Sequence, residues 1–431
     1  MASLQSTQIR NTSESENNKQ NTQDKITLET IKSLSNKVRL VDSDETNNLE
    51  LYCYLNISEG DDPILEKCRG VVFNGDNLIV EAYPHTEEII DSNVALIKQK
   101  MADNFDKYSI FESHEGCLIR MFWFNDRWNI STHRKLNAFR SKWASKESFG
   151  TIFKRAIENL YNYDENFRNA VGDSELPLFE RYQNVLDKNN QYMFLLKNTF
   201  DNRIVCCAPE KPVVYHAGTM KNGKLDINDD CHIPRAKKLH FKDVDDMLGY
   251  IDQEMDVTRY QGVICFSNDE NLKHLKIIKE EYDDFFKARG NESSIKFRYL
   301  QVRSTNRNYT DKLYVLYPHM ASCFEETEKI ICQIGTEIYN SYVNRFIRKK
   351  FVTLPTEDYA VMRECHKWHE LDRSSNRVDE QKVMEVLNQQ PPTAINKMIR
   401  RWRIVKETNN NIIENASRKQ RSNTITDDNN E

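Results

Sequence analysis

The chain has 431 residues with 39% hydrophobic content, which is enough for two or three domains with buried cores. Its 61 basic and 66 acidic residues give a net charge of -5, which excludes a strong overall attraction to nucleic acid and leaves only a local basic patch for that purpose. The ten cysteines are scattered without the paired spacing of zinc ligands, which favours reduced thiols in a cytoplasmic location and no bound metal.

Both ends of the chain are predicted to be disordered tails. Residues 1–25 and 406–431 contain few large apolar side chains and many Asn, Gln, Ser and Thr, so burial cannot offset the entropy of ordering them. The N-terminus has no apolar signal region, and no apolar run approaches the roughly 20 residues that cross a bilayer. The sequence therefore predicts no membrane association.

The first part of the region between the tails has the pattern of β-strands. From about 36 to 135, short β-branched and aromatic runs are broken by Asn-Gly-Asp or Asn-Asp turns. Within it, "SIFESHEGCLIRMF" at 109–122 predicts a strand, a polar turn and a second strand, an arrangement that often presents a reactive group. A nucleophilic role for Cys117 in this turn is disfavoured, because His114 is the only flanking group that can become a cation.

The rest of the chain changes from helix to strand and back to helix. Residues 143–188 have helical spacing, and strand signals return between "YMFLLKNT" and "LKHLKII". Between about 290 and 405 the apolar spacing is again helical, which predicts an α+β domain at 26–290 and a helical C-terminal domain at 291–405. Cys365, His366 and His369 share one helical turn, but without an evident fourth ligand they indicate packing rather than a metal site.

Six short motifs follow one another through the α+β region. They are "EKCRGVVFN" at 66–74, "ESHEGCLI" at 112–119, "ISTHRKLNAFRSKW" at 130–143, "FLLKNTFDNRIV" at 194–205, "YQGVICF" at 260–266 and "LKHLKIIKEEY" at 272–282. In this order they resemble the phage-type, ATP-dependent RNA ligases of the covalent nucleotidyltransferase superfamily. The resemblance covers about 45–290 and implies an RNA-ligase-like α+β domain with antiparallel sheets. Residues 365–400 also resemble the C-terminal part of RNA-ligase-like proteins of large cytoplasmic DNA viruses.

The resemblance places a serine where the family has its nucleophile. In an active member the turn reads Lys-x-Asp-Gly, and the lysine attacks the α-phosphate of ATP, which requires an amine of lowered pKa. Here Ser113 stands at the lysine position, while Glu115 and Gly116 preserve the turn. A serine ester of AMP is chemically possible, but the local sequence offers no base to activate the hydroxyl.

Three further positions depart from the family pattern. Leu196 and Gln261 stand where the resemblance implies carboxylates that hold the metal and the ribose, and Ile278 stands at a lysine that neutralises phosphate. We expect Leu196 and Ile278 to fill the space of the lost polar groups and to make a nucleotide pocket drier and smaller.

The residues that the resemblance leaves as nucleotide- or RNA-binding candidates are mostly basic, although a surface salt bridge or a solvated strand end would also explain them. In the α+β region they are Arg69, Glu115, Gly116, Thr132, His133, Arg134, Lys135 and Lys276. A C-terminal basic patch consists of Arg345, Arg348, Lys349 and Lys350, which can equally be a solvated helix end.

The prediction for function is a noncatalytic, RNA- or partner-binding pseudoligase in viral RNA metabolism or transcription, located in the host cytoplasm or the virion. One alternative is an active ATP-dependent RNA ligase or nucleotidyltransferase with a non-standard site. Another is a structural docking subunit of an RNA-processing or transcription assembly. RNA and the proteins of such an assembly are the predicted partners. No cofactor is expected, and ATP with Mg²⁺ applies only to the enzymatic alternative.

Overall fold

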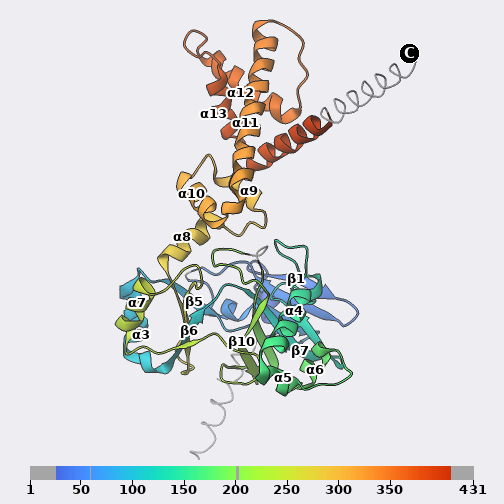
Figure 1. Ribbon diagram of the computed structural model, residues 1–431, viewed down its shortest axis with the longest axis vertical. Helices are drawn as coiled ribbons and strands as arrows, with labels where there is room; N and C mark the ends of the chain where they lie inside the picture. The colour runs from blue at the N-terminus through green and yellow to red at the C-terminus, as the bar shows by residue number, and fades with distance from the viewer. Residues whose placement is uncertain (1–25, 59, 200–202, 409–431) are drawn as a thin grey trace, which may run out of the picture. The chain divides into compact units, whose positions relative to one another are not determined.

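The computed structural model describes residues 26–58, 60–199 and 203–408, which form two compact units divided between Asp283 and Asp284 (Figure 1). Unit 1 combines three largely antiparallel sheets with helices, and unit 2 is helical, so the predicted α+β class with a helical C-terminal region is confirmed. The predicted tails at 1–25 and 409–431 lie outside the described residues, whereas 406–408 continue a helix that begins at 392.

Sheet A is an antiparallel meander near the N-terminus. Its strands, in spatial order, are β1 (Val38–Asp44), β2 (Leu49–Tyr54), β3 (Arg69–Asn74) and β4 (Asn77–Val80). Tight turns join β1 to β2 and β3 to β4, and Asn48 and Gly75 supply the positive φ angles of 52° and 55° that such turns need. A longer segment connects β2 to β3. The helix α2 (Leu28–Ser33) and the 3₁₀ turn η1 (Pro63–Lys67) contribute apolar side chains to the core of this sheet.

Sheet B gathers strands from distant parts of the chain. Its order is β12 (Lys238–Leu239), β6 (Tyr108–Ser113), β13 (Gly262–Ser267), β14 (His274–Ile278) and β5 (Thr86–Ile90). All neighbours are antiparallel except β14 and β5. The helices α3 (Val94–Met101) and α7 (Val244–Gln253) cover one face with apolar side chains, and the 3₁₀ turn η2 (Ala102–Lys107) leads into β6.

Sheet C lies beside sheet A and carries its own helical cover. Its order is β11 (Lys224–Asp226), β10 (Val213–Lys221), β9 (Gln191–Lys197), β7 (Cys117–Phe124) and β8 (Arg127–Ser131). The 3₁₀ turn η3 (Ala138–Arg140) leads to α4 (Phe149–Tyr163), α5 (Glu165–Val171) and α6 (Leu178–Asn184), which pack on one face. Figure 1 shows α4 to α6 in green beside β7 and β10.

The side chains of β7 alternate between two cores. Ile119 and Met121 pack into the cluster under α4, whereas Phe122 packs with aliphatic side chains of sheet A. Arg120 shares the face of Phe122, since the side-chain period of a strand is two residues. Its guanidinium is therefore carried into the junction between sheets A and C, where the residue is 1% exposed.

Arg120 joins two backbone segments across this junction. It donates to the carbonyl oxygen of Gly70 at the start of β3 and, at 2.8 Å, to the carbonyl oxygen of Thr132 just after β8. Gly70 has a φ of 85°, and a Cβ there would stand 2.8 Å from the Cα of His133. Burial lowers the pKa of Arg120 to about 10, so the group still carries its charge at neutral pH. The two segments are held in contact by one buried cation.

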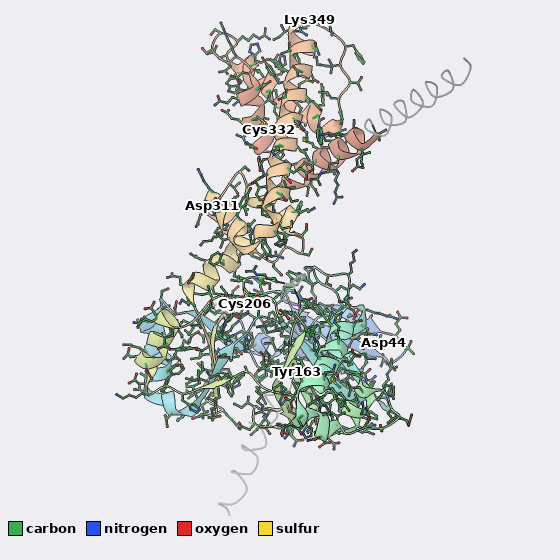
Figure 2. The ribbon with its side chains drawn as sticks, in the orientation of Figure 1. Asp44, Tyr163, Cys206, Asp311, Cys332 and Lys349 are labelled. Carbon is green, nitrogen blue, oxygen red and sulfur yellow. The ribbon has the colours of Figure 1, made fainter. Side chains whose placement is uncertain are left out.

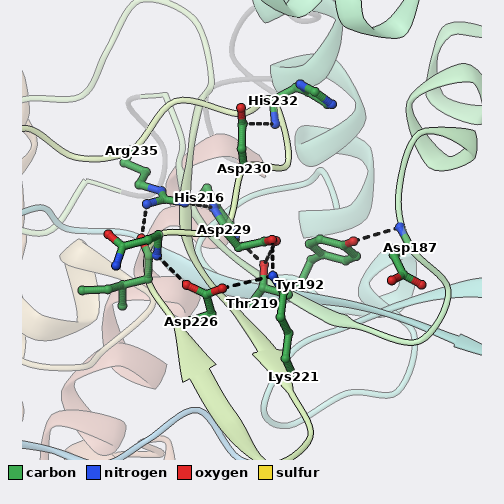
Figure 3. Close-up of polar contacts among 12 residues, drawn as sticks. Asp187, Tyr192, His216, Thr219, Lys221, Asp226, Asp229, Asp230, His232 and Arg235 are labelled. Carbon is green, nitrogen blue, oxygen red and sulfur yellow. Dashed lines mark hydrogen bonds and ion pairs between the residues drawn. The ribbon is translucent and has the colours of Figure 1, made fainter. Parts of the chain in front are cut away.

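A polar network fixes the outer edge of sheet C (Figure 3). Thr219 Oγ1 donates to Asp229 Oδ2 at 2.7 Å and lies 2.9 Å from His216 Nε2, and Lys221 forms an ion pair with the same aspartate. Arg235 lies 3.5 Å from His216 Nδ1. Burial and this arginine lower the pKa of His216 to about 4. Because Thr219 is fully buried, the network holds a loop to β10 and offers no accessible hydroxyl.

Unit 2 begins inside α8 (Glu280–Arg289), which spans the division. Its further helices are α9 (Ile295–Val302), α10 (Arg307–Leu316), η5 (Pro318–Met320), α11 (Ala321–Tyr342), the π-helical turn η6 (Val343–Ile347), α12 (Thr356–Leu371), α13 (Glu380–Asn388) and 392–408. Apolar side chains of α9, α11, α12, α13 and 392–408 form one core. Arg303 and Glu328 add a bidentate ion pair at 2.5 and 2.6 Å. None of the described helices is long and apolar enough to cross a membrane.

We predict that Arg120→Met lowers the free energy of unfolding of unit 1 by roughly 2–5 kcal/mol, because two buried carbonyl groups lose their donor. Urea unfolding followed by tryptophan fluorescence measures the change. The matched control is Arg127→Met on the neighbouring strand β8, where the side chain is exposed and the expected change is within about 0.5 kcal/mol. Equal stability of the two variants would show that Arg120 does not hold the junction.

Candidate functional site

The turn between β6 and β7 is the point where the chain passes from sheet B to sheet C. Residues 114–116 therefore lie between two sheets instead of closing a hairpin. Every residue of β6 is buried, Ser113 at its end is 4% exposed, and Glu115 is 8% exposed. Side chains of the protein itself enclose Ser113 and Glu115, whereas Gly116 is exposed.

Glu115, the acidic residue of the turn, is bound by donors of the protein itself. Its Oε1 accepts hydrogen bonds from the Val205 backbone N–H at 2.7 Å and from the Tyr282 hydroxyl at 2.8 Å. Burial raises the pKa of Glu115, and the backbone N–H donors act against that rise. The carboxylate thereby fixes the loop that follows β9 and the start of α8. Cys206 in that loop is buried as well (Figure 2).

His114 is enclosed by aromatic rings. Its ring stacks on Tyr215 with centroids 4.7 Å apart and contacts Tyr260 at 5.0 Å. Lys197 Nζ lies 3.4 Å from Nδ1, and Glu112 Oε2 lies 3.6 Å from Nε2. Burial, followed by the charge of Lys197, lowers the pKa of His114 to about 4. A neutral imidazole therefore fills the position between the serine and the glutamate of the motif. The sequence prediction did not include His114 among the site residues. Its position inside the motif, between Ser113 and Glu115, could have indicated it.

Ser113 has no base beside its hydroxyl. Its carbonyl oxygen accepts from the Gln261 N–H at 2.8 Å, in the β6–β13 pairing. Among the described residues, the Ser113 hydroxyl makes no hydrogen bond to a carboxylate or an imidazole, so proton removal at this oxygen has no evident acceptor. Gln261 Oε1 is buried and has no hydrogen-bond partner in the described part of the chain.

Leu196 and Ile278 lie in different sheets. Leu196 packs in the core under α4, because strand alternation turns it away from the turn. Its neighbour Leu195 takes that place, since its Cγ lies 2.8 Å from where a Cβ on Gly116 would stand. Ile278 is buried on sheet B and pairs with Gly262. Leu196 and Ile278 are both buried, and the expectation that they make a nucleotide pocket drier and smaller stays a prediction.

Arg69, His133 and Arg134 are brought together where sheet A meets the end of β8. Arg69 lies beside Tyr54, and both arginines are exposed. Burial lowers the pKa of His133 to about 3, with further contributions from the charges of Arg69, Arg120 and Arg134. Within the described residues, neither Arg69 nor Arg134 has a carboxylate at salt-bridge distance. Two exposed guanidinium groups without an acidic partner suit an external phosphate.

The two other basic candidates of unit 1, Lys135 and Lys276, have acidic partners. Lys135 Nζ lies 3.1 Å from Asp42 Oδ1, and Lys276 Nζ lies 3.0 Å from Glu88 Oε1. Thr132 Oγ1 accepts from the Lys135 N–H at 3.1 Å and so shapes the turn that presents Arg134. Arg345, Arg348, Lys349 and Lys350 belong to unit 2, whereas the other candidates belong to unit 1.

The cysteine and histidines of α12 take part in packing. Cys365 lies in the core of unit 2, and His366 stacks on Phe346 with centroids 3.7 Å apart. His369 Nδ1 lies 2.6 Å from the Asn376 carbonyl oxygen. Over the described ranges, no group of three or more His, Cys, Asp or Glu side chains could hold a metal ion.

The enclosure of His114 generates a prediction for pH dependence. Its pKa is about 4 in the folded protein against 6.5 for a free histidine, so only the unfolded chain gains a proton as pH falls from 6.5 toward 4. At about pH 5 this should cost the folded state roughly 2 kcal/mol. In His114→Phe, the loss of melting temperature between about pH 7.5 and 5 should be smaller than in the parent. The exposed His232→Gln is the control and should keep the parent's loss. An equal loss in His114→Phe would mean that His114 is protonated in the folded protein.

Comparisons with solved structures give loose overlaps with ligases. A putative ATP-dependent DNA ligase from Aquifex aeolicus is 15% identical at a TM-score of 0.38 over 79% of this chain and 87% of its own. Two forms of an archaeal ATP-dependent RNA ligase are 11% and 10% identical, with TM-scores of 0.39 and 0.36. They cover 68% and 87% of this chain, and 69% and 94% of their own. TM-scores this low support no conclusion about chemistry.

Comparisons with known sequences give a firmer result, although no protein-family model matches the chain. The immediate-early protein ICP-46 homolog of Invertebrate iridescent virus 6 is 30% identical over 374 residues, covering 82% of this chain and 80% of that protein. The homolog of Invertebrate iridescent virus 3 is 28% identical over 64% of this chain, and ICP-46 of Frog virus 3 is 25% identical over 54%. This chain spans only 57% and 58% of those two relatives. From the identity and coverage of the first relative, the chain belongs to the family of ICP-46 immediate-early protein homologs of iridescent viruses.

Proposed function

We propose that this protein is a noncatalytic, RNA-ligase-like viral protein that binds RNA through Arg69 and Arg134. The observation that carries the proposal is the exposed pair of guanidinium groups without a carboxylate partner among the described residues. Buried Arg120 positions the two backbone segments that carry them, because it binds the carbonyl groups of Gly70, which follows Arg69, and of Thr132, two residues before Arg134. Fixed guanidinium groups suit contacts to a phosphate backbone, which position RNA without reading its sequence.

The absence of catalysis is supported by how the β6–β7 turn is used. Nucleotidyl transfer at this turn would need an activated nucleophile and free carboxylates for a metal. The Ser113 hydroxyl makes no hydrogen bond to a base among the described residues, Glu115 is held by Val205 and Tyr282, and Leu195 occupies the space that a side chain on Gly116 would need. In this proposal ATP and Mg²⁺ have no role.

The relatives give the proposal a setting. They are viral proteins named as immediate-early, which is consistent with a part in viral RNA metabolism or transcription. Proteins of such an assembly would be its partners, in the host cytoplasm or the virion.

The first prediction is that α-labelled ATP or GTP with Mg²⁺ or Mn²⁺ leaves no covalent label on the protein in a denaturing gel. Ser113→Lys alone should also remain unlabelled, because Leu196 and Gln261 stand in place of the carboxylates that the mechanism needs. A labelled, acid-stable band in the parent that disappears in Ser113→Ala would contradict the proposal and favour an enzyme with a serine nucleophile.

The second prediction concerns Arg69→Gln combined with Arg134→Gln. Loss of two phosphate contacts should weaken binding to all short single-stranded RNAs and reduce the slope of log affinity against log salt by about 1.4. Fluorescence anisotropy at several salt concentrations measures both. The charge-matched control is Lys135→Gln with Lys276→Gln, two cations that are paired with Asp42 and Glu88, which should change neither. If the parent protein does not bind RNA at low salt, RNA binding is not its function, and docking to protein partners becomes the better explanation.

A further inference from the structure

Unit 2 carries a basic surface where α11 ends. The helix passes into the π-helical turn η6, and the chain then runs without regular structure from 348 to 355. This stretch contains Arg345, Arg348, Lys349 and Lys350, and Lys349 lies beyond the end of α11 (Figure 2). It has a φ of 54° in the left-handed region, a conformation that is uncommon outside glycine and more frequent at functional positions.

The four cations of this surface have no acidic partner. Within the described residues, no carboxylate lies at salt-bridge distance from any of them. The nearby acids of α12 are already used, since Glu357 and Asp358 pair with Arg401. In a chain of net charge -5, this is a local concentration of unneutralised positive charge.

Two large apolar side chains are exposed among these cations. Phe351 is 92% exposed and Ile347 is 64% exposed. The Phe351 ring therefore contributes almost nothing to the core, although it stands directly after Lys350. Exposed aromatic rings between cations are the means by which proteins stack unpaired bases while holding the phosphates.

The neighbouring aromatic side chains support the same reading. The Arg345 guanidinium lies 5.7 Å from the centre of the Phe346 ring and 5.5 Å from that of Tyr359. His366 stacks on Phe346, so the ring beneath Arg345 is itself held in place. A guanidinium fixed over aromatic rings is oriented before a ligand arrives, which lowers the entropy cost of binding.

We propose that this surface, formed by Arg345, Arg348, Lys349, Lys350 and Phe351, binds single-stranded nucleic acid by stacking a base on Phe351 and holding the adjacent phosphates. A duplex does not fit this chemistry, because its bases are already stacked and paired. The proposal does not depend on RNA binding by Arg69 and Arg134, and the two surfaces can be tested separately.

The experiment measures fluorescence anisotropy of the full-length protein with labelled oligouridylate and oligothymidylate of about 12 nucleotides, and with a duplex of the same length. Phe351→Ala should weaken binding to the single strands about 5- to 150-fold and leave the salt slope unchanged. Arg348→Gln, Lys349→Gln and Lys350→Gln together should reduce that slope by about 2. Phe351 is too exposed for its removal to affect folding, and circular dichroism checks this. Leu371→Ala, which removes another exposed apolar side chain of unit 2, is the control and should bind like the parent.

The outcomes separate the two surfaces and the competing ligands. The same loss from Phe351→Ala in a background of Arg69→Gln and Arg134→Gln supports the proposal whether or not unit 1 binds RNA. Unchanged single-strand binding in Phe351→Ala overturns it, even if the charge variant binds weakly. Sedimentation with phosphatidylserine vesicles tests whether the surface binds an anionic membrane instead. Vesicle binding that needs Phe351, without single-strand binding, also overturns it in favour of a membrane surface.

Discussion

The contact on which the rest of unit 1 depends is the pair of hydrogen bonds from buried Arg120. One cation holds the carbonyl of Gly70 on sheet A and that of Thr132 at the end of sheet C. Without it, two buried acceptors lack a donor at the place where the sheets meet. The same contact positions the segments that carry Arg69, which directly precedes Gly70, and Arg134, which lies two residues after Thr132. The hydrogen bonds of Arg120 therefore both hold the two sheets together and place the exposed pair of arginines.

The motif turn shows how a position associated with chemistry can be used for packing. Glu115 fixes a loop and a helix start, and His114 fills the space between Tyr215 and Tyr260. Burial removes water from both groups and disfavours their charged forms, so it raises the pKa of Glu115 and lowers the pKa of His114. The cost is offset by hydrogen bonds and ring contacts within the protein. A turn committed in this way has little freedom to bind a triphosphate and a metal.

The distribution of ion pairs divides the basic residues into two kinds. Lys135 and Lys276 are paired with carboxylates, so their charges are largely used within the fold. Arg69, Arg134 and the cations after α11 have no such partner in the described residues. With a net charge of -5, attraction to a polyanion must come from such local groups, because the mean field of the protein opposes it.

Residue pattern alone determined the α+β class, the helical C-terminal region and Ser113 at the end of a buried strand, because these follow from local periodicity and from motif order. It could not decide which face of β9 meets the turn, because a shift of one residue moves every side chain of a strand to the opposite face. Only the packing of Leu196 under α4 shows that Leu195 is the residue that lies against Gly116. Nor could it decide which cations are free. Asp42 lies 93 positions from Lys135, and Glu88 lies 188 positions from Lys276. Ion pairs and buried bonds across such separations depend on where the folded chain returns, which no local pattern records.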